Sequence, residues 1–283
     1  MSPLAIPPRP EASRDRRALT AAALLILLGS LAFTRANPAL LLSPDALRSM
    51  GGFGAAFFPP DLSWDFLSAT LRPAVETVQL ATAGVALAIL LGFPMALLAA
   101  GSFHLGGVLF EGDPELPPAG RGLRAAPYWL SRLALNFMRS IPELIWALIF
   151  VRAAGLGALA GILALGVAYA GIMGKVFAEI MEGADLRPAL ALRAAGASRP
   201  KAILYGVLPP IFRQLLSYGL YRWECGMRAA AIMGFVGAGG LGQHIEIAMR
   251  MFERRQTATL ILELALLIGL TDLLSAKLRR RLA

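Results

Sequence analysis

The sequence predicts an all-α protein that crosses a membrane with about six helices. Hydrophobic residues make up 57% of the 283 residues, charged residues only 16%, and the mean hydropathy is +0.64. Soluble domains carry about 25% charged residues, and a soluble globule of this length has too little interior to hide so much apolar surface. Apolar segments close to the ~20 residues that span a bilayer recur along the chain. The excess apolar surface is therefore expected to face lipid.

Six segments are expected to span the membrane. They are Ala18–Phe33, Ala74–Ala100, Leu133–Val151, Leu156–Ile180, Pro210–Val236 and Thr257–Ser275. The first is short, and the fifth is interrupted by charged residues. No shift in composition marks a second folded domain. We therefore expect a tail of residues 1–17 followed by one membrane domain, residues 18–283.

The first segment has two interpretations. Arg14, Arg16 and Arg17 form a basic head before the apolar run Ala18–Phe33, as in a signal peptide. The residues that follow, 34–38, do not form a clear small-x-small cleavage site. An uncleaved first membrane helix is the favoured interpretation.

The basic residues give an independent test of this topology. With the amino terminus inside, the inner segments hold Arg9, Arg14, Arg16, Arg17, Arg121, Arg124, Arg187, Arg193, Arg199, Lys201, Lys277, Arg279, Arg280 and Arg281. The outer segments hold fewer, namely Arg35, Arg48, Arg72, Arg250, Arg254 and Arg255. Positive charge is enriched on the cytoplasmic side of membrane proteins. Both termini are therefore expected in the cytoplasm.

The composition also excludes several classes of site. The net charge is +9, but the arginines lie at the ends of apolar segments and form no basic and aromatic surface stripe, so nucleic acid is not an expected partner. The sole cysteine, Cys225, allows no internal disulfide. His104 and His244 stand alone without metal-ligand spacing, so we expect no metal and no cofactor.

Two glycine patterns resemble nucleotide-binding motifs only superficially. Residues 237–242 match the dinucleotide fingerprint, but they follow a predicted membrane helix, whereas the fingerprint requires a strand before it. Gly171–Lys175 resembles the end of a phosphate-binding loop, but Tyr169 replaces a required glycine and Val176 replaces the residue that would hold magnesium. Any ATP-driven role therefore requires an ATPase on another subunit.

Ionisable residues at membrane depth are costly and usually functional. Three oppositely charged pairs have a spacing of four residues: Arg139 and Glu143, Glu224 and Arg228, Lys175 and Glu179. Residues four apart share one helical face. Two interpretations stay open, because the pairs either line a polar path between helices or neutralise themselves and only fix the packing.

The loop of residues 185–209 contains a short predicted helix, Pro188–Ala195, followed by Gly196 at a suitable C-cap position. The loop combines apolar residues, Leu190, Leu192, Ile203 and Leu204, with basic ones, Arg187, Arg193, Arg199 and Lys201. A short amphipathic helix outside the bilayer suits a groove on another protein. The alternative is a helix that lies on acidic lipid headgroups.

This loop resembles the EAA loop of binding-protein-dependent ABC importer permeases. The resemblance lies in Leu190–Gly196, followed by Val207-Leu208-Pro209, with Leu190 where the family usually has glutamate. In that family the loop forms a coupling helix that sits in a cleft of the ATPase. The resemblance assigns this role to Ala191, Leu192, Arg193, Ala194, Ala195, Gly196, Leu208 and Pro209.

Further segments are similar to the phosphonate and phosphite permeases of that family. They are Phe57–Asp61, Arg139–Glu143, Leu204–Pro209, Tyr221–Glu224, Arg228–Ala230 and Gly234–Gly242, whereas Gly226 stands where the subfamily often has asparagine. The resemblance implies an inner-membrane permease homodimer with two ATPase subunits and a substrate-binding protein outside. The chain itself would do no chemistry and would carry phosphonate, phosphite or a related phosphorus oxyanion by alternating access.

An anionic substrate requires positive partners along its path, and arginine binds oxyanions bidentately. Arg139 and Arg228 are therefore expected to line the path, and Glu143 and Glu224 to orient them or balance their charge. Four glycines, Gly237, Gly239, Gly240 and Gly242, predict either a compact, partly re-entrant outer segment or a close helix crossing.

Three rival functions remain to be weighed. A permease of the same scaffold could carry phosphate or an amino acid, although Phe57–Asp61 and Tyr221–Glu224 oppose the amino-acid reading. An ion-coupled secondary transporter could use the same intramembrane charges but would not need a docking helix. A membrane-embedded enzyme would need a nucleophile, metal cluster or acid–base group, and the sequence offers none.

Overall fold

The computed structural model describes residues 12–34, 43–106, 109 and 118–282. Every regular element within these ranges is a helix. The predicted all-α class is therefore confirmed. The chain divides into two compact units, residues 1–58 and 59–283.

The first unit contains α1 (Ala12–Phe33) and α2 (Pro44–Ala55). α1 includes the whole of the first predicted segment, and its apolar stretch, Ala18–Phe33, is shorter than a full membrane span. α2 begins at Ser43, whose hydroxyl oxygen accepts a hydrogen bond from the amide of Ala46 at 3.2 Å. Such a cap satisfies one of the free amide donors at a helix start.

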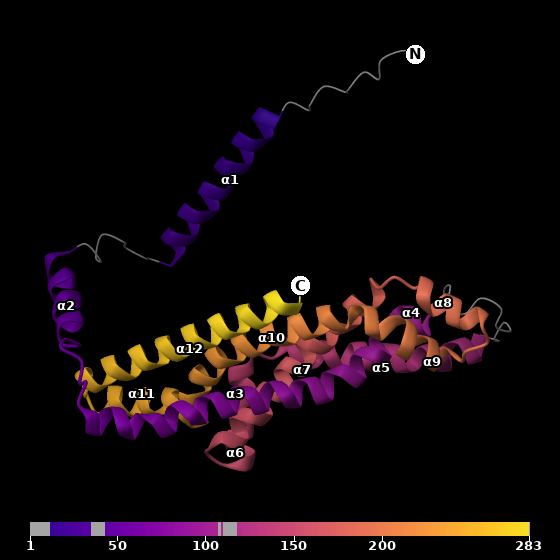
Figure 1. The fold of residues 1–283 in the computed structure, drawn as a ribbon. Helices are drawn as coiled ribbons and strands as arrows, with labels where there is room; N and C mark the ends of the chain where they lie inside the picture. Colours follow the sequence, from indigo (N-terminus) through magenta and orange to yellow (C-terminus); the bar gives the residue numbers. More distant parts are fainter. Residues whose placement is uncertain (1–11, 35–42, 107–108, 110–117, 283) are drawn as a thin grey trace. The chain divides into compact units, whose positions relative to one another are not determined.

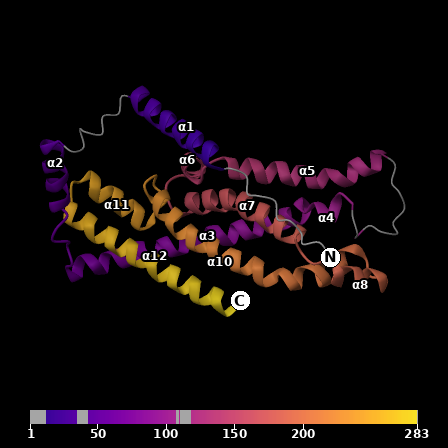
Figure 2. The ribbon, with the colours of Figure 1, turned by 90° about the horizontal axis from the view of Figure 1, so that it is seen from above.

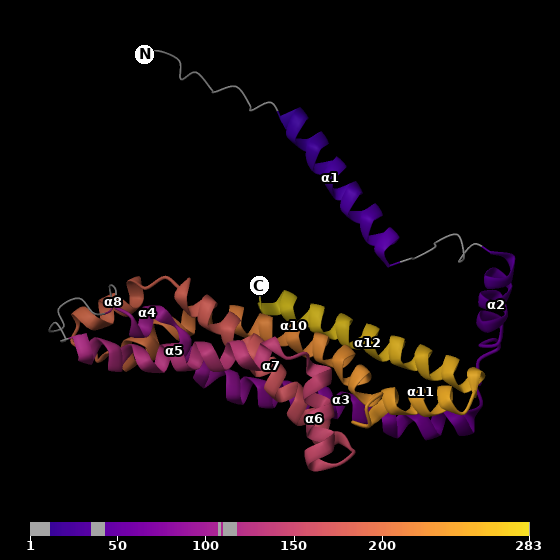
Figure 3. The same ribbon diagram turned by 180° about the vertical axis from the view of Figure 1, so that it is seen from behind.

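The second unit is a bundle of long helices. In chain order it contains α3 (Trp64–Ala99), α4 (Gly101–His104), α5 (Pro118–Ser140), α6 (Glu143–Ala154), α7 (Ala158–Glu182), α8 (Arg187–Ala194), α9 (Arg199–Ala202), a π-helical turn (Ile203–Val207), α10 (Leu208–Gly234), α11 (Gly240–Arg250) and α12 (Arg254–Leu282). α3, α7, α10 and α12 run along its length, α8 and α9 lie at one end, and α11 lies at the other (Figures 1, 2 and 3).

Three described helices are long and apolar enough to cross a membrane, namely α3, α7 and α12. α5 and α6 pass the same test only as a bent pair. α10 is of comparable length, 27 residues, but carries Arg213, Arg222, Glu224 and Arg228. Its composition is therefore more polar than that of a simple lipid-facing span, and this agrees with the interruptions seen in the sequence.

The expectation that Leu133–Val151 forms one continuous span is wrong. α5 ends at Ser140, α6 begins at Glu143, and their axes differ by 89°. Pro142 lies at the break with ψ 143°, outside the helical range. Proline has no amide hydrogen and disfavours the helical conformation in the residue before it, so the chain turns here.

Glycines allow α3 and α7 to approach closely. A Cβ added at Gly92 would lie 2.8 Å from the carbonyl oxygen of Ala170, and one at Gly174 would lie 3.0 Å from the carbonyl oxygen of Gly92. A Cβ at Gly171 would lie 2.6 Å from the amide nitrogen of Arg139 in α5. Small residues at such crossings are the usual means of packing membrane helices. The glycines of the phosphate-loop-like pattern are therefore packing positions.

Hydrogen bonds fix the end of the bundle opposite α8. The hydroxyl of Thr259 in α12 donates to the carbonyl oxygen of Asp61 at 2.7 Å, and Arg255 Nε donates to the carbonyl oxygen of Pro59 at 2.9 Å. These bonds join the start of α12 to the segment that leads into α3. Part of the Phe57–Asp61 segment thus anchors one helix to another.

Candidate docking helix and translocation path

The predicted docking helix is present as α8, displaced by one residue toward the amino terminus. It ends as the sequence indicates, because Gly196 has φ +89°. The amide of Gly196 donates to the carbonyl of Arg193, and the amide of Ala197 donates to the carbonyl of Leu192, both at 2.9 Å. This is the Schellman arrangement, in which a glycine in the left-handed region closes the helix.

An ion pair fixes the start of α8. Arg187 Nη2 lies 2.6 Å from Asp185 Oδ2, and the Arg187 amide donates to Asp185 Oδ1 at 3.0 Å. These hydrogen bonds hold the pKa of the Asp185 carboxyl below its usual value. The carboxylate therefore stays ionised at neutral pH and keeps the loop folded at this point.

α8 rests on the π-helical turn that leads into α10. A Cβ at Gly206 would lie 2.6 Å from the Cα of Ala189, so the two backbones are in direct contact. Ala189 of α8, Ala202 of α9 and Val207 of the π-helical turn are completely buried. A π-helical turn often marks a functional site, and here it links the docking helix directly to α10.

The two faces of α8 have different surroundings. Ala191, Ala194 and Ala195 are exposed, whereas Leu190 and Leu192 are partly buried and pack against the core. Leu190, which replaces the glutamate usual at this position, therefore has an apolar environment within the chain. The exposed residues of α8 are thus Arg187 and Pro188 in its first turn and the small side chains of Ala191 and Ala194 after it.

Glu224 and Arg228 form the ion pair that their spacing predicts, at 3.1 Å. The pair is part of a larger network between α10 and α12. Arg228 Nη2 also lies 2.8 Å from Asp272 Oδ2, and Arg279 Nη1 lies 3.0 Å from Glu224 Oε2. Glu224 is nearly buried, with 12% of its side chain exposed. The network holds two arginines and two carboxylates, so its net charge is zero.

The other predicted pairs behave differently. Arg139 Nε donates to the Asn136 side chain at 3.0 Å, and no ion pair among the described residues joins Arg139 to Glu143, because the chain turns between them. No hydrogen bond or ion pair in those ranges links either residue to the α10–α12 network. Lys175 and Glu179 do pair, at 2.5 Å, with 32% and 45% of their side chains exposed.

The glycine-rich run forms an irregular turn and includes a close helix crossing. Gly237, Gly239 and Gly240 have positive φ angles of 91°, 93° and 71° and form the irregular turn between α10 and α11. The turn is fixed by the Leu241 amide, which donates to the Thr77 hydroxyl of α3 at 2.9 Å. A Cβ at Gly242 would collide with the backbone of α10, so this glycine provides a close helix crossing.

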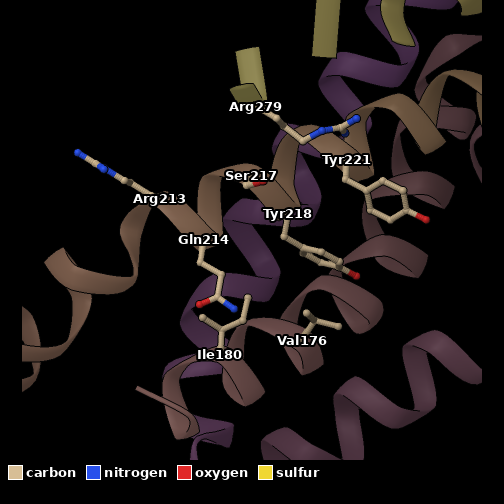
Figure 4. A pocket seen from close by; sticks show the side chains of 8 residues that line it. All are labelled: Val176, Ile180, Arg213, Gln214, Ser217, Tyr218, Tyr221 and Arg279. Carbon is tan, nitrogen blue, oxygen red and sulfur yellow. The ribbon is translucent and has the colours of Figure 1, made fainter. Parts of the chain in front are cut away.

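An open cavity of about 630 Å³ lies between α7, α10 and α12, near the end that carries α8 (Figure 4). It is lined by Val176, Ile180, Arg213, Gln214, Ser217, Tyr218, Tyr221 and Arg279. The lining includes two arginines and no carboxylate. Sequence reasoning did not find this cavity, because its walls come from three helices far apart in the chain.

Comparison with known proteins identifies the family. A profile described as "Binding-protein-dependent transport system inner membrane component" matches residues 118–283. The chain belongs to this family. It is therefore a multi-pass inner-membrane permease subunit of an ABC importer, and membership implies work with an ATPase and a substrate-binding protein. The resemblance seen in the docking loop is confirmed.

Two curated relatives come from Stutzerimonas stutzeri. A phosphite transport system permease protein is 34% identical over 236 residues, which cover 83% of this chain and 78% of the relative. A putative phosphite transport system permease protein is 35% identical over 233 residues, which cover 82% of this chain and 76% of the relative. Both alignments span most of the second unit.

Solved structures support the same fold. The inward-facing MetNI methionine ABC transporter matches with a TM-score of 0.62 and 21% identity, over 78% of this chain and all of that one. An amino acid ABC transporter matches with a TM-score of 0.56 and 16% identity, over the same shares. At these identities the likeness establishes the arrangement of helices and carries no information on substrate.

Proposed function

We propose that this chain forms the translocation path of an ABC importer for a phosphorus oxyanion, namely phosphite or a phosphonate. The observation that carries the proposal is the similarity to two phosphite permeases over more than 80% of the chain. A phosphate-import permease protein of Mycolicibacterium smegmatis is also 32% identical over 73% of the chain. The related anion phosphate therefore belongs in any test.

The docking helix α8 transmits the movement of the ATPase. Its exposed alanines enter a groove of the ATPase, together with the rest of the loop, residues 185–209. Because Ala189 contacts Gly206 in the π-helical turn, a shift of α8 displaces the start of α10. The bundle then alternates between outward-open and inward-open states. ATP hydrolysis takes place on the separate ATPase subunit.

In this proposal the importer contains two copies of the chain in a lipid bilayer, and each copy contributes one permease domain, residues 18–283. Both termini lie in the cytoplasm, on the side of α8, and the turn of Gly237, Gly239, Gly240 and Gly242 lies toward the outside. A symmetric homodimer is the commonest closed assembly. The substrate-binding protein docks on the outer side.

Arg139, Glu143, Glu224 and Arg228 are proposed as residues of the path. Glu224 balances Arg228 when the path is empty, as their 3.1 Å contact allows. Arg139 lies at the turn between α5 and α6, where its side chain is exposed and carries no carboxylate partner among the described residues. Transport that survives the double change Arg139→Gln and Arg228→Gln would contradict this assignment.

The test is uptake into proteoliposomes that contain this chain with its ATPase, supplied with the binding protein and ATP. Phosphite, a phosphonate, phosphate and an amino acid are compared, each with active and with inactivated ATPase. The proposal expects phosphite or phosphonate uptake that disappears with the ATPase activity. Uptake that persists without ATP hydrolysis would instead indicate a secondary transporter, and preferred uptake of the amino acid would refute the substrate class.

A further inference from the structure

Polar residues form a continuous stripe along α10. Gln214, Ser217, Tyr218, Tyr221 and Arg222 follow one another at intervals of three, one, three and one residues, so they share one helical face. Figure 4 shows Gln214 and Tyr218 directed toward the part of α7 that carries Val176 and Ile180. The first four of these residues line the cavity between α7, α10 and α12. The polar face of α10 therefore points into this cavity.

Arg222 is the last residue of this stripe and has an unusual environment. Its guanidinium carbon lies 4.9 Å from the ring centre of Tyr169 in α7 and 5.8 Å from that of Tyr218. Its Nε is buried and has no hydrogen-bond partner. No ion pair among the described residues involves Arg222, in contrast to Arg228 and Arg279. Two aromatic faces thus hold a cation that no carboxylate neutralises.

Such a cation requires an explanation. A charged side chain at membrane depth is costly and marks a substrate or ion pathway by default. Cation–π contact offsets part of this cost, but it uses the faces of the guanidinium plane, and the Nε donor at the edge of the plane has no partner. The edge of a guanidinium carries the fork of N–H donors that binds phosphate-like oxyanions bidentately. Arg222 is therefore arranged to bind an anion at the edge of its guanidinium plane.

Arg222 lies next to a residue of the cavity wall. Tyr218 lines the cavity on one side and contacts Arg222, which lies one helical turn farther from α8. Arg213 supplies positive charge to the lining, which contains no carboxylate, whereas the lining residue Arg279 is paired with Glu224. A small anion within about 630 Å³ has room for itself and several water molecules. The hydroxyls of Ser217, Tyr218 and Tyr221 offer additional donors.

We propose that this cavity is a phosphorus-oxyanion site on the translocation path, with Arg222 as its anchoring cation. Tyr169 and Tyr218 position the guanidinium, and Arg213 attracts the anion from the α8 end. The inference rests on the proposed function and adds a site to it. A free oxyanion and the phosphate of a lipid headgroup share this chemistry, so the experiment includes lipid arms.

Transport gives the first test, in proteoliposomes with the complete importer, ATP and phosphite. Arg222→Gln is expected to lower the maximal uptake rate about 10- to 100-fold, because hydrogen bonds to a charged group are lost. Binding-protein-stimulated ATP hydrolysis should remain within about twofold of the unchanged importer, since α8 is untouched. Fewer anions are then moved per ATP, whereas a purely structural defect lowers both rates together. Arg222→Lys should restore part of the uptake.

Arg152→Gln is the matched control, because Arg152 is an exposed arginine in the last turn of α6. Equal uptake per ATP by Arg222→Gln and Arg152→Gln would overturn the site while leaving the proposed function intact. An unchanged importer that takes up no phosphorus oxyanion would instead refute the proposed function itself.

Direct labelling gives the second test and does not depend on transport. The chain has one cysteine, so a Cys225→Ala, Ser217→Cys variant places a single thiol in the cavity wall. The purified permease–ATPase complex is placed in phosphatidylcholine nanodiscs, and phosphite is expected to slow thiol labelling. Adding Arg222→Gln should abolish this protection. Absence of protection by phosphite would overturn the proposal. Protection that requires phosphatidylglycerol and does not depend on phosphite would also overturn it, because the cavity would then hold a lipid headgroup.

Discussion

Arg222 and Arg228 lie six residues apart on α10, yet the chain surrounds them in opposite ways. Arg228 contacts Glu224 at 3.1 Å and Asp272 at 2.8 Å. Arg222 lies over the rings of Tyr169 and Tyr218, its Nε has no partner, and no carboxylate among the described residues pairs with it. An arginine that is already neutralised must leave its carboxylates before it meets an anion. An arginine held by aromatic faces can meet the anion without such an exchange.

The difference separates two tasks on one helix. The ion-pair network joins α10 to α12, since Arg279 of α12 also reaches Glu224, and it keeps the proposed path residue Arg228 balanced by carboxylates while the path is empty. The aromatic site provides an uncompensated positive charge beside a cavity. We therefore expect the stability of the protein to depend mainly on the ion-pair network, and transport to depend mainly on the aromatic site around Arg222.

The largest effect on stability is expected from Glu224→Leu. This change removes the carboxylate that Arg228 and Arg279 share and leaves two cations without it. Removing one partner of a buried ion pair costs about 3–5 kcal/mol, and we expect about 2 kcal/mol here because both arginines are partly exposed. The midpoint of thermal unfolding of the purified complex measures the loss.

Glu179→Gln is the control for this prediction. Glu179 pairs with Lys175 in the same i,i+4 geometry, but 45% of its side chain is exposed. An exposed pair of this kind contributes about 0.3–0.5 kcal/mol. If the two variants unfold at the same temperature, the network does not stabilise the packing of α10 on α12.

The next largest effect is expected from the aromatic residues around Arg222. Tyr169→Leu removes one of the two rings that hold the guanidinium, whereas Tyr169→Phe keeps it. A desolvated cation–π contact contributes about 1–2 kcal/mol, so Tyr169→Leu should lower phosphite uptake per ATP by about 5- to 30-fold. Tyr169→Phe should remain close to the unchanged importer. Equal losses in both variants would show that the hydroxyl, and not the ring, supports transport.

The smallest effect concerns the contact between Arg228 and Asp272. A double-mutant cycle of Arg228→Gln and Asp272→Asn should give a coupling energy of about 0.5–1 kcal/mol in unfolding, because 46% and 36% of the side chains are exposed. The double variant should be more stable than the sum of the single losses predicts. Strict additivity would mean that this contact contributes nothing measurable.

Local signals in the sequence predicted the parts of the fold that depend on neighbouring residues. α8 was predicted to within one residue, because Gly196 closes it, with the Gly196 amide bonded to Arg193 and the Ala197 amide bonded to Leu192. The spacing of Glu224 and Arg228 predicted their ion pair. Pro142 lies within the segment Leu133–Val151, but the 89° turn beside it was not predicted.

Features that depend on distant segments could not be predicted in this way. Asp272 and Arg279 join the network from another helix, and the only signal in the sequence was an isolated aspartate within the sixth apolar segment. Arg222 gives no signal in the sequence, because no opposite charge lies four residues before or after it. The aromatic ring of Tyr169 that it contacts comes from another helix. The role of Gly171 follows only from its contact with α5 across the bundle.

The most direct test of the central claim compares Arg222→Lys with Arg228→Lys in reconstituted importers. Both changes keep the positive charge and remove the guanidinium fork. They differ only in the surroundings of the changed residue, which are aromatic rings for Arg222 and carboxylates for Arg228. The measured quantity is phosphite taken up per ATP hydrolysed. The account predicts a loss several times larger for Arg222→Lys than for Arg228→Lys. A larger loss for Arg228→Lys, or equal losses, would contradict it.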